Sequence, residues 1–371
     1  MSYYDTYLRY RECDWNSLFA EPSERLVNNA LDDEEVTVEQ FLAMLSKNAV
    51  PRLEEMARRA HELTLRYFGR TIQLYTPLYL SNYCDNRCVY CGFNADNAIS
   101  RKLLSAEDLE REASLISATG LKHILVLTGE SRQMSPVSYI KECIEILRKY
   151  FTSISIEIYA LTENEYAELV GAGVDGLTIY QEVYDENIYA EMHPIGPKSD
   201  YRFRLDAPER GARAGIRVVN VGVLFGLDDW RKETFLMGLH AKYLQDKFPD
   251  VEVGASIPRL QPHAGSFIST HVVTDADIVQ AILALRIFLP RLSLTISTRE
   301  SARFRENILP LGITRMSAGS STCVGGHTAE AIGPGERVPQ FEISDMRDVA
   351  GIKEMLKNRG YQPVMKDWVS V

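Results

Sequence analysis

Long apolar runs are missing from this chain of 371 residues, and so is any excess of basic residues. No run reaches the roughly 20 residues that a membrane-spanning helix needs. Asp and Glu number 51 against 41 Lys and Arg, and the net charge of −10 disfavours nucleic acid as a partner. The first residues also lack the basic and apolar regions of a signal peptide. We therefore expect a cytoplasmic protein with neither a nucleic-acid nor a membrane partner.

Cysteine is scarce as well, since the whole chain has only six. Three are scattered without the spacing of a disulfide framework, namely Cys13, Cys143 and Cys323. The other three fall together in the run CDNRCVYC, as Cys84, Cys88 and Cys91. This clustering makes the run the first candidate for chemistry.

Three thiolates at this spacing can hold three irons of a [4Fe–4S] cluster and leave the fourth iron without a protein ligand. S-adenosylmethionine can chelate that iron through its amino and carboxylate groups. An electron from the cluster then cleaves the sulfonium and gives a 5′-deoxyadenosyl radical. Tyr90, just before the last cysteine, is expected to lie against the adenine of this cofactor.

Two other uses of the three thiols stay open at this point. A structural zinc site is normally closed by four ligands, but no fourth Cys or His lies near the loop, and His123 is remote in sequence. A disulfide pair with one spare thiol is the other alternative. The cluster is favoured because the sequence that flanks the loop agrees with it.

The pattern from residue 71 onward predicts an α/β fold. Short apolar, β-branched runs alternate with amphipathic stretches, which indicates a parallel sheet. We expect eight strands, over Ile72–Leu80, His123–Thr128, Ile154–Tyr159, Gly176–Tyr180, Val218–Leu224, Val253–Ile257, Leu292–Ser297 and Thr314–Ser317. Their number and spacing match a (β/α)8 TIM-type barrel, with a partial barrel as the alternative.

The two ends of the chain read as additions to this barrel. Residues 1–70 are polar with apolar residues at helical spacing, and they are expected to form a helical extension with helices over 36–45 and 51–67. The barrel is expected to span 71–320. Residues 321–371 form a tail that packs on it, with one helix over 346–359 and then a short polar end.

Candidate binding residues follow the strands, because the chemistry of a parallel barrel sits where the strands end. Gly129 and Glu130 come after the second strand, where a glycine permits close backbone approach and Glu130 can accept hydrogen bonds from an ammonium group. Glu157 ends the third strand, and Gln181 and Glu182 end the fourth. These three residues are expected either to contact the cofactor or to form structural hydrogen bonds inside the barrel.

Two arginines stand at the same end of the predicted barrel. Arg259 follows the sixth strand and Arg299 the seventh. The planar guanidinium suits a carboxylate, so either could bind an acidic substrate group. Either could equally form a salt bridge between loops.

These motifs carry a family resemblance. The run CDNRCVYC followed by GFNADN resembles the radical S-adenosylmethionine superfamily. The wider chain is similar to the 2-iminoacetate synthases, the tyrosine lyases of thiamine thiazole biosynthesis. The segments that carry this similarity are YTPLYLSNYC, TGE, YQEVYDE, LFGLDDW, STRESARFRENILPLGI and QPVMKDW.

The resemblance implies a reaction and a set of roles. The deoxyadenosyl radical would abstract a hydrogen from the amino group of L-tyrosine, and Cα–Cβ cleavage would give 4-cresol and dehydroglycine. Arg299, helped by Ser297, would hold the substrate carboxylate. Gly129 and Glu130 would contact the ammonium group of S-adenosylmethionine. His240 would be a core histidine or a group behind the site. Cys323 is expected to be a small buried side chain.

The resemblance also implies partners and alternatives. A thiazole synthase would take over the hydrolysable imine, and a flavodoxin- or ferredoxin-type protein would supply electrons. Hydrogenase-maturase lyases continue with a C-terminal cysteine motif, whereas no cysteine follows Cys323 here. The alternatives are a lyase of another aromatic amino acid such as tryptophan, a maturase-type lyase, and an iron–sulfur or zinc protein without radical chemistry.

Overall fold

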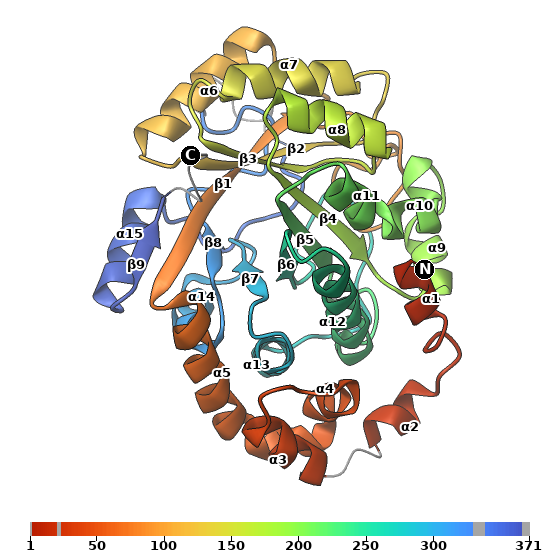
Figure 1. Cartoon of the computed structure of the whole chain (residues 1–371). Coiled ribbons are helices and arrows are strands. Elements are labelled where there is room, and N and C mark those ends of the chain that lie inside the picture. The colour runs from red at the N-terminus through yellow and green to blue at the C-terminus, as the bar shows by residue number, and fades with distance from the viewer. Residues whose placement is uncertain (1, 21–23, 329–337, 366–371) are drawn as a thin grey trace.

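The computed structural model describes residues 2–20, 24–328 and 338–365, and its centre is a closed barrel of parallel strands (Figure 1). Eight strands form the barrel wall, and β1 closes it by pairing with both β2 and β8. These are β1 Thr71–Ser81, β2 His123–Thr128, β3 Ser153–Glu157, β4 Gly176–Glu182, β5 Val218–Val223, β6 Glu252–Ser256, β7 Ser293–Ile296 and β8 Arg315–Ser317. The predicted TIM-type barrel is confirmed, with strand bounds that differ from the expected ones by at most two residues.

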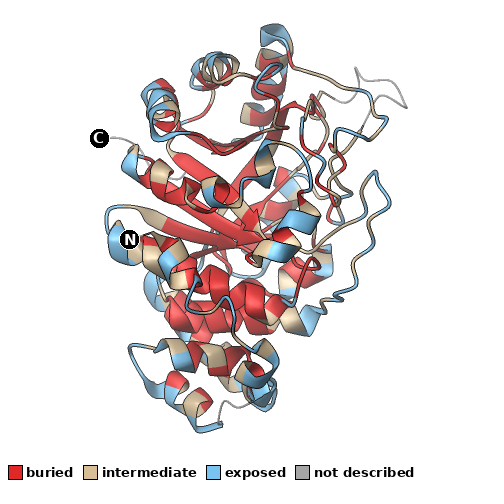
Figure 2. Ribbon diagram, turned by 90° about the vertical axis from the view of Figure 1, so that its right-hand side faces the viewer, coloured by how far each residue is buried: buried red, intermediate tan, exposed pale blue. Residues whose placement is uncertain are grey.

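The strands are buried almost throughout, as Figure 2 shows. Helices surround the wall and cover the outer faces of the strands (Figure 1). They are α6 Ala106–Ala118, α7 Val137–Leu147, α8 Glu163–Ala172, α9 Glu186–Met192, α10 Tyr201–Leu205, α11 Ala207–Arg213, α12 Trp230–Lys247, α13 Asp275–Phe288 and α14 Ala302–Asn307. Burial on both faces explains the short β-branched runs of the sequence. No helix among the described residues has both the length and the apolar character required to cross a membrane.

The N-terminal residues form helices that pack against α12 and α13 (Figure 1). They are α1 Tyr3–Tyr7, α2 Trp15–Ala20, α3 Glu24–Asp32, α4 Val38–Leu45 and α5 Leu53–Phe68. Phe41 of α4 stacks on Phe288 of α13 with ring centroids 4.2 Å apart. The expected helices over 36–45 and 51–67 are therefore present as α4 and α5.

The C-terminal residues add a helix and an unexpected strand. Helix α15 covers Val349–Asn358, within the expected range, but Gln362–Val364 form β9 instead of a polar end. β9 pairs in parallel with the first residues of β1. β1 pairs with β2 only from Thr76 onward. The first residues of β1 therefore have an edge that β2 does not cover, and β9 pairs with this edge. The final three residues of QPVMKDW lie outside the described residues.

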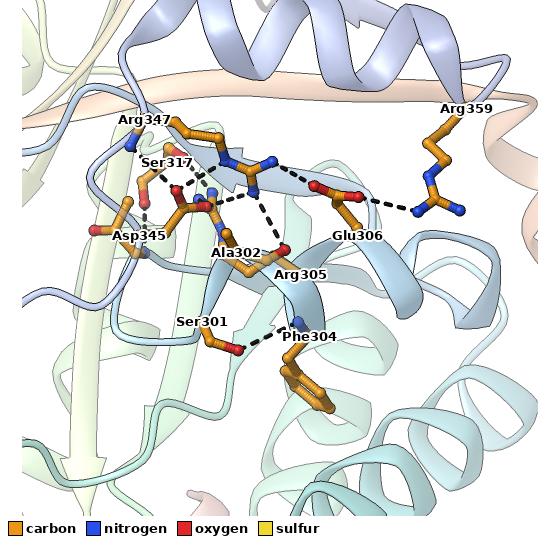
Figure 3. A network of polar contacts seen from close by, with 10 residues as sticks. Ser301, Ala302, Phe304, Arg305, Glu306, Ser317, Asp345, Arg347 and Arg359 are labelled. Atoms are coloured by element: carbon orange, nitrogen blue, oxygen red, sulfur yellow. Dashed lines mark hydrogen bonds and ion pairs between the residues drawn. The ribbon is translucent and has the colours of Figure 1, made fainter.

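A polar network fastens the segment before α15 to the barrel (Figure 3). The fully buried Arg305 donates to the carboxylate of Asp345 and to the carbonyl of Ser317. Arg347 bonds to the same Asp345 and, at 2.6 Å, to Glu306. Arg305 and Glu306, both in the sequence ARFREN, thus anchor residues 338–348 across the end of the barrel.

Candidate active site

The cysteine loop begins where β1 ends. The register between β1 and β2 shifts between Tyr79 and Ser81, which turns the chain out of the sheet. Cys88 is only 5% exposed, while Cys84 and Cys91 are half-buried. All three line one pocket at the carboxyl end of the barrel. The structure therefore brings the three predicted thiols together.

Burial favours the neutral form of these thiols. Burial raises the pKa of Cys88 to about 12, and burial together with Cys91 raises the pKa of Cys84. Three such thiolates need a cationic partner to be deprotonated together. In the described ranges no three His, Cys, Asp or Glu side chains lie close enough to share a single metal ion. A [4Fe–4S] cluster gives each thiolate its own iron, so the three thiols fit that group.

Side-chain amides support the loop at both ends. Asn86 donates to Glu130 Oε2 at 2.6 Å and to the sulfur of Cys84 at 3.8 Å. Gln340 donates to the sulfur of Cys91 at 3.7 Å. Sequence reasoning missed Gln340, because it lies 249 positions from Cys91 and reaches it only through the anchored segment 338–348.

Close contact with the cysteine loop leaves no room for a side chain at Gly129, the glycine of the TGE motif. A Cβ atom on Gly129 would lie 2.3 Å from the carbonyl oxygen of Tyr83. The amide of Gly129 donates to Ser81 O, and the carbonyl of Glu130 accepts from the amide of Asp85 at 2.7 Å. The motif therefore packs directly under the cysteine loop.

Glu182 enters the same pocket through a distorted strand end. The β4–β5 register shifts between Tyr180 and Glu182, and Glu182 has a left-handed backbone with φ of 71°. Its carboxylate accepts from Lys198 at 2.8 Å and lies 3.8 Å from Arg204. Burial acts to raise the pKa of Glu182, but Lys198 and Arg204 outweigh it and bring the pKa below its usual value. Gln181, at the distortion itself, is buried and does not line the pocket.

The pKa of Glu157 is shifted in the opposite direction to that of Glu182. Burial and the nearby Glu182 raise its pKa to about 7, although Arg299, Arg204 and Lys198 act against this rise. The pocket therefore holds one carboxyl that is partly protonated at neutral pH beside one that is ionised. Lys198 and Arg204 had no signal in the sequence, since neither follows a strand directly.

The cysteine pocket is one part of a larger cavity. Three adjoining pockets of about 590, 550 and 480 Å³ share Glu157 and Gln340 in their walls. Cys88 and Cys91 line the first two, and Arg299 lines the last two. Ser297 lines the last one alone. Such a cavity can hold a cofactor at the cysteine end and a smaller molecule at the arginine end.

The two arginines at the cavity end differ in their partners. Arg259 bonds to Glu300 at 3.0 Å and to Asp275 at 2.8 Å, so it forms a salt bridge between loops. Arg299 lies with its Cζ atom 3.3 Å from the ring centroid of Phe341 and forms no ion pair with the described carboxylates. Of the two, Arg299 is the one that can receive a carboxylate from a ligand.

Three further residues from the sequence lie elsewhere. His240 stacks on Tyr3 and bonds to the hydroxyl of Tyr184 at 2.9 Å, so it is a core histidine behind the barrel wall. His123 bonds to Ser155 inside the barrel and does not line the cysteine pocket. The expectation of a buried Cys323 is wrong, because it is half-buried where the chain passes Tyr79 on its way to the anchored segment.

Comparison with known proteins agrees with this geometry. The Radical SAM superfamily matches residues 78–237, and the Biotin and Thiamin Synthesis associated domain matches residues 256–362. A 2-iminoacetate synthase of Escherichia coli K12 is 38% identical over 98% of this chain and 96% of its own length. The chain belongs to the 2-iminoacetate synthase family of radical S-adenosylmethionine enzymes. It is accordingly a radical S-adenosylmethionine lyase.

Solved structures of the hydrogenase maturase HydG are also similar to this chain. One, described as a maturase of the [FeFe]-hydrogenase, has a TM-score of 0.86 and 31% identity, covering 98% of this chain and 79% of its own. HydG from Carboxydothermus hydrogenoformans has the same TM-score at 30% identity, covering 98% and 83%. The shared fold thus extends over nearly all of this chain.

Proposed function

We propose that this lyase cleaves the Cα–Cβ bond of L-tyrosine to 2-iminoacetate (dehydroglycine) and 4-cresol, and so supplies the thiazole unit of thiamine. The observation that carries the proposal is the single cavity with three thiols at one end and an arginine without a carboxylate partner among the described residues at the other. Two binding sites that face one another suit a reaction between a bound cofactor and a bound amino acid.

At the cysteine end, Cys84, Cys88 and Cys91 would hold the cluster. When bound, the cluster and S-adenosylmethionine supply a carbon-centred radical that can remove a hydrogen atom. Tyr90 would offer its ring to the adenine. The other proposed cofactor contacts are Gly129, Glu130, Glu157, Gln181 and Glu182. Of these, Gln181 alone does not line the cysteine pocket.

At the other end, Arg299 would receive the substrate carboxylate, with Ser297 beside it in the same wall. The guanidinium offers two parallel N–H groups, so it fixes the orientation of a carboxylate as well as its position. The amino group of the substrate would then face the cysteine end of the cavity. A radical attacks whatever hydrogen it meets, so this orientation decides which bond breaks.

The proposal is tested by anaerobic turnover. The cluster-loaded protein is incubated with S-adenosylmethionine, dithionite and either tyrosine or tryptophan. We expect 5′-deoxyadenosine, 4-cresol and glyoxylate, the hydrolysis product of the imine, from tyrosine alone. Consumption of tryptophan in place of tyrosine would contradict the substrate. Bound zinc without any 5′-deoxyadenosine would contradict radical chemistry altogether.

Two partners follow from the chemistry of the reaction. The imine hydrolyses in water, so direct transfer to a thiazole synthase would protect it. Reduction of the cluster needs a one-electron donor of the flavodoxin or ferredoxin type. Formation of a complex between this chain and a thiazole synthase, measured by analytical ultracentrifugation, would support the first of these.

A further inference from the structure

A short segment lies along the cysteine loop, and only its last residue, Lys198, has a role in the site described so far. It comprises residues 192–198, from the last residue of α9 into the short 3-10 helix Pro197–Ser199, and is called the strap here. The amide of Val89 donates to the carbonyl of Met192 at 3.1 Å, and the amide of Arg87 donates to the carbonyl of Ile195 at 3.0 Å. The strap therefore holds the backbone on both sides of Cys88.

Gly196 allows the strap to approach this closely. It has φ of +111°, and a Cβ atom there would lie 2.3 Å from Asn86 Oδ1 and 2.7 Å from Asn86 Cα. Two residues later the amide of Lys198 donates to the same Oδ1 at 2.8 Å. Both the backbone conformation and the space require glycine at this position.

His193 of the strap meets Tyr90 of the cysteine loop. His193 is 1% exposed, and its Nδ1 lies 2.8 Å from the carbonyl of Tyr189. A carbonyl only accepts, so the proton is on Nδ1 and Nε2 is an acceptor. The hydroxyl of Tyr90, 2.7 Å from Nε2, is therefore the donor. Burial and the nearby Lys198 lower the pKa of His193 well below its usual value, which keeps the ring neutral.

Lys198 completes the contacts of the same hydroxyl. Its Nζ donates to the oxygen of Tyr90 at 3.0 Å and to Glu182 at 2.8 Å. The Tyr90 hydroxyl thus donates one hydrogen bond to His193 and accepts another from Lys198, and both partners belong to the strap. With its hydroxyl held at two points, the ring cannot turn freely about its side-chain torsions.

We propose that His193 is a positioning residue for the cofactor, which acts through the hydroxyl of Tyr90 and fixes the ring that adenine will meet. Lys198 acts with it by tying the same hydroxyl to Glu182. The inference rests on the proposed function, because it assumes that S-adenosylmethionine binds beside Tyr90. A preformed ring spares the cofactor the cost of ordering it on binding.

The test compares four variants of the cluster-loaded protein. His193→Asn keeps a donor for Tyr189 but does not reach Tyr90, whereas His193→Gln keeps an acceptor for Tyr90. Tyr90→Phe removes the hydroxyl alone, and the fourth variant combines His193→Asn with Tyr90→Phe. The measurements are iron content, the dissociation constant of S-adenosylmethionine, and the change in the electron paramagnetic resonance of the reduced cluster when the cofactor is added.

We expect His193→Asn and Tyr90→Phe each to raise the dissociation constant about three- to tenfold, which corresponds to the cost of ordering one side chain on binding. The double variant should lose no more than either single one, because both remove the same bond. His193→Gln should bind within about twofold of the parent protein. Iron content should stay unchanged throughout.

His240 provides a matched control. It is also a buried histidine bonded to a tyrosine hydroxyl, but it does not line the cysteine pocket. His240→Asn should lower thermal stability and leave the affinity for S-adenosylmethionine unchanged. An equal loss of affinity in this variant would overturn the inference, since the effect would then be a general result of core damage.

The remaining outcomes separate the two proposals. Unchanged affinity in Tyr90→Phe overturns the inference and decides the matter even if His193→Asn does not fold. Losses that add in the double variant overturn it as well, because they show independent roles. If the parent protein, loaded with its cluster, does not bind S-adenosylmethionine at all, the proposed function fails and the inference fails with it.

Discussion

Glu157 and Glu182 face the same pocket, and their pKa values are shifted in opposite directions. Burial acts to raise both, but Lys198 lies 2.8 Å from Glu182 and reverses the effect there. Paired carboxyls whose environments separate their pKa values are typical of active sites. Of these two carboxyls, only Glu157 therefore changes its charge near neutral pH.

The first prediction concerns Glu157 and stability. Its pKa of about 7 in the folded chain exceeds the usual 4.5, so between these values the folded state holds a proton that the unfolded state has lost. Stability therefore falls as pH rises through this window, and the deficit is complete above it. We expect Glu157→Gln to stabilise the cluster-free protein by about 3 kcal/mol at alkaline pH and by almost nothing near pH 4.5. Denaturant unfolding at both pH values measures this, and an equal difference at the two would contradict the assignment.

Glu182 gives a prediction of the opposite sign. Its pKa is lowered in the folded chain, so its contribution to stability is present above the unfolded pKa and lost as pH falls through the folded one. Glu182→Gln should destabilise the cluster-free protein by about 2–3 kcal/mol at neutral pH, because Lys198 is left buried without its carboxylate. The loss should shrink in acid, where Glu182 is protonated in the parent protein as well. A pH-independent loss would show that shape and not charge is responsible.

Arg299 gives a prediction about the substrate. Arg299→Ala should raise the KM for tyrosine about 100-fold, because a charge-assisted, bidentate contact is lost. Iron content and binding of S-adenosylmethionine should not change. Arg299→Lys should recover only part of the loss, since an ammonium cannot form the planar pair. Unaltered tyrosine kinetics in Arg299→Ala would remove this residue from the site.

Arg259 is the matched control for that experiment. Its guanidinium is engaged by Glu300 and Asp275. Arg259→Ala should therefore lower the melting temperature and leave the KM for tyrosine near its original value. The two arginines look equivalent in the sequence, and Glu300 stands directly beside Arg299 there. In the folded chain Glu300 turns away and pairs with Arg259.

The same comparison shows what sequence could and could not predict. Each barrel strand is buried on both faces, so its β-branched run marks it locally, and all eight were found. β9 has only three residues and includes Pro363, which leaves no local pattern. The cysteine triad was visible because its members are close in sequence. Lys198, Gln340 and Phe341 reach the cavity only through the strap and the anchored segment, whose positions depend on distant contacts.

The last prediction uses two glycines that differ in their surroundings. A Cβ on Gly129 would lie 2.3 Å from the Tyr83 carbonyl, just before the first cysteine, and backbone there cannot move without moving Cys84. Gly171, in α8, has nothing within 4 Å of the same position. Gly129→Ala should therefore lower the iron content after anaerobic reconstitution, whereas Gly171→Ala should keep it and gain about 0.5–1 kcal/mol of stability from better helix propensity. Full iron loading in Gly129→Ala would show that the cysteine loop tolerates displacement. In that case the close packing of the TGE motif against the loop would not determine the geometry of the thiols.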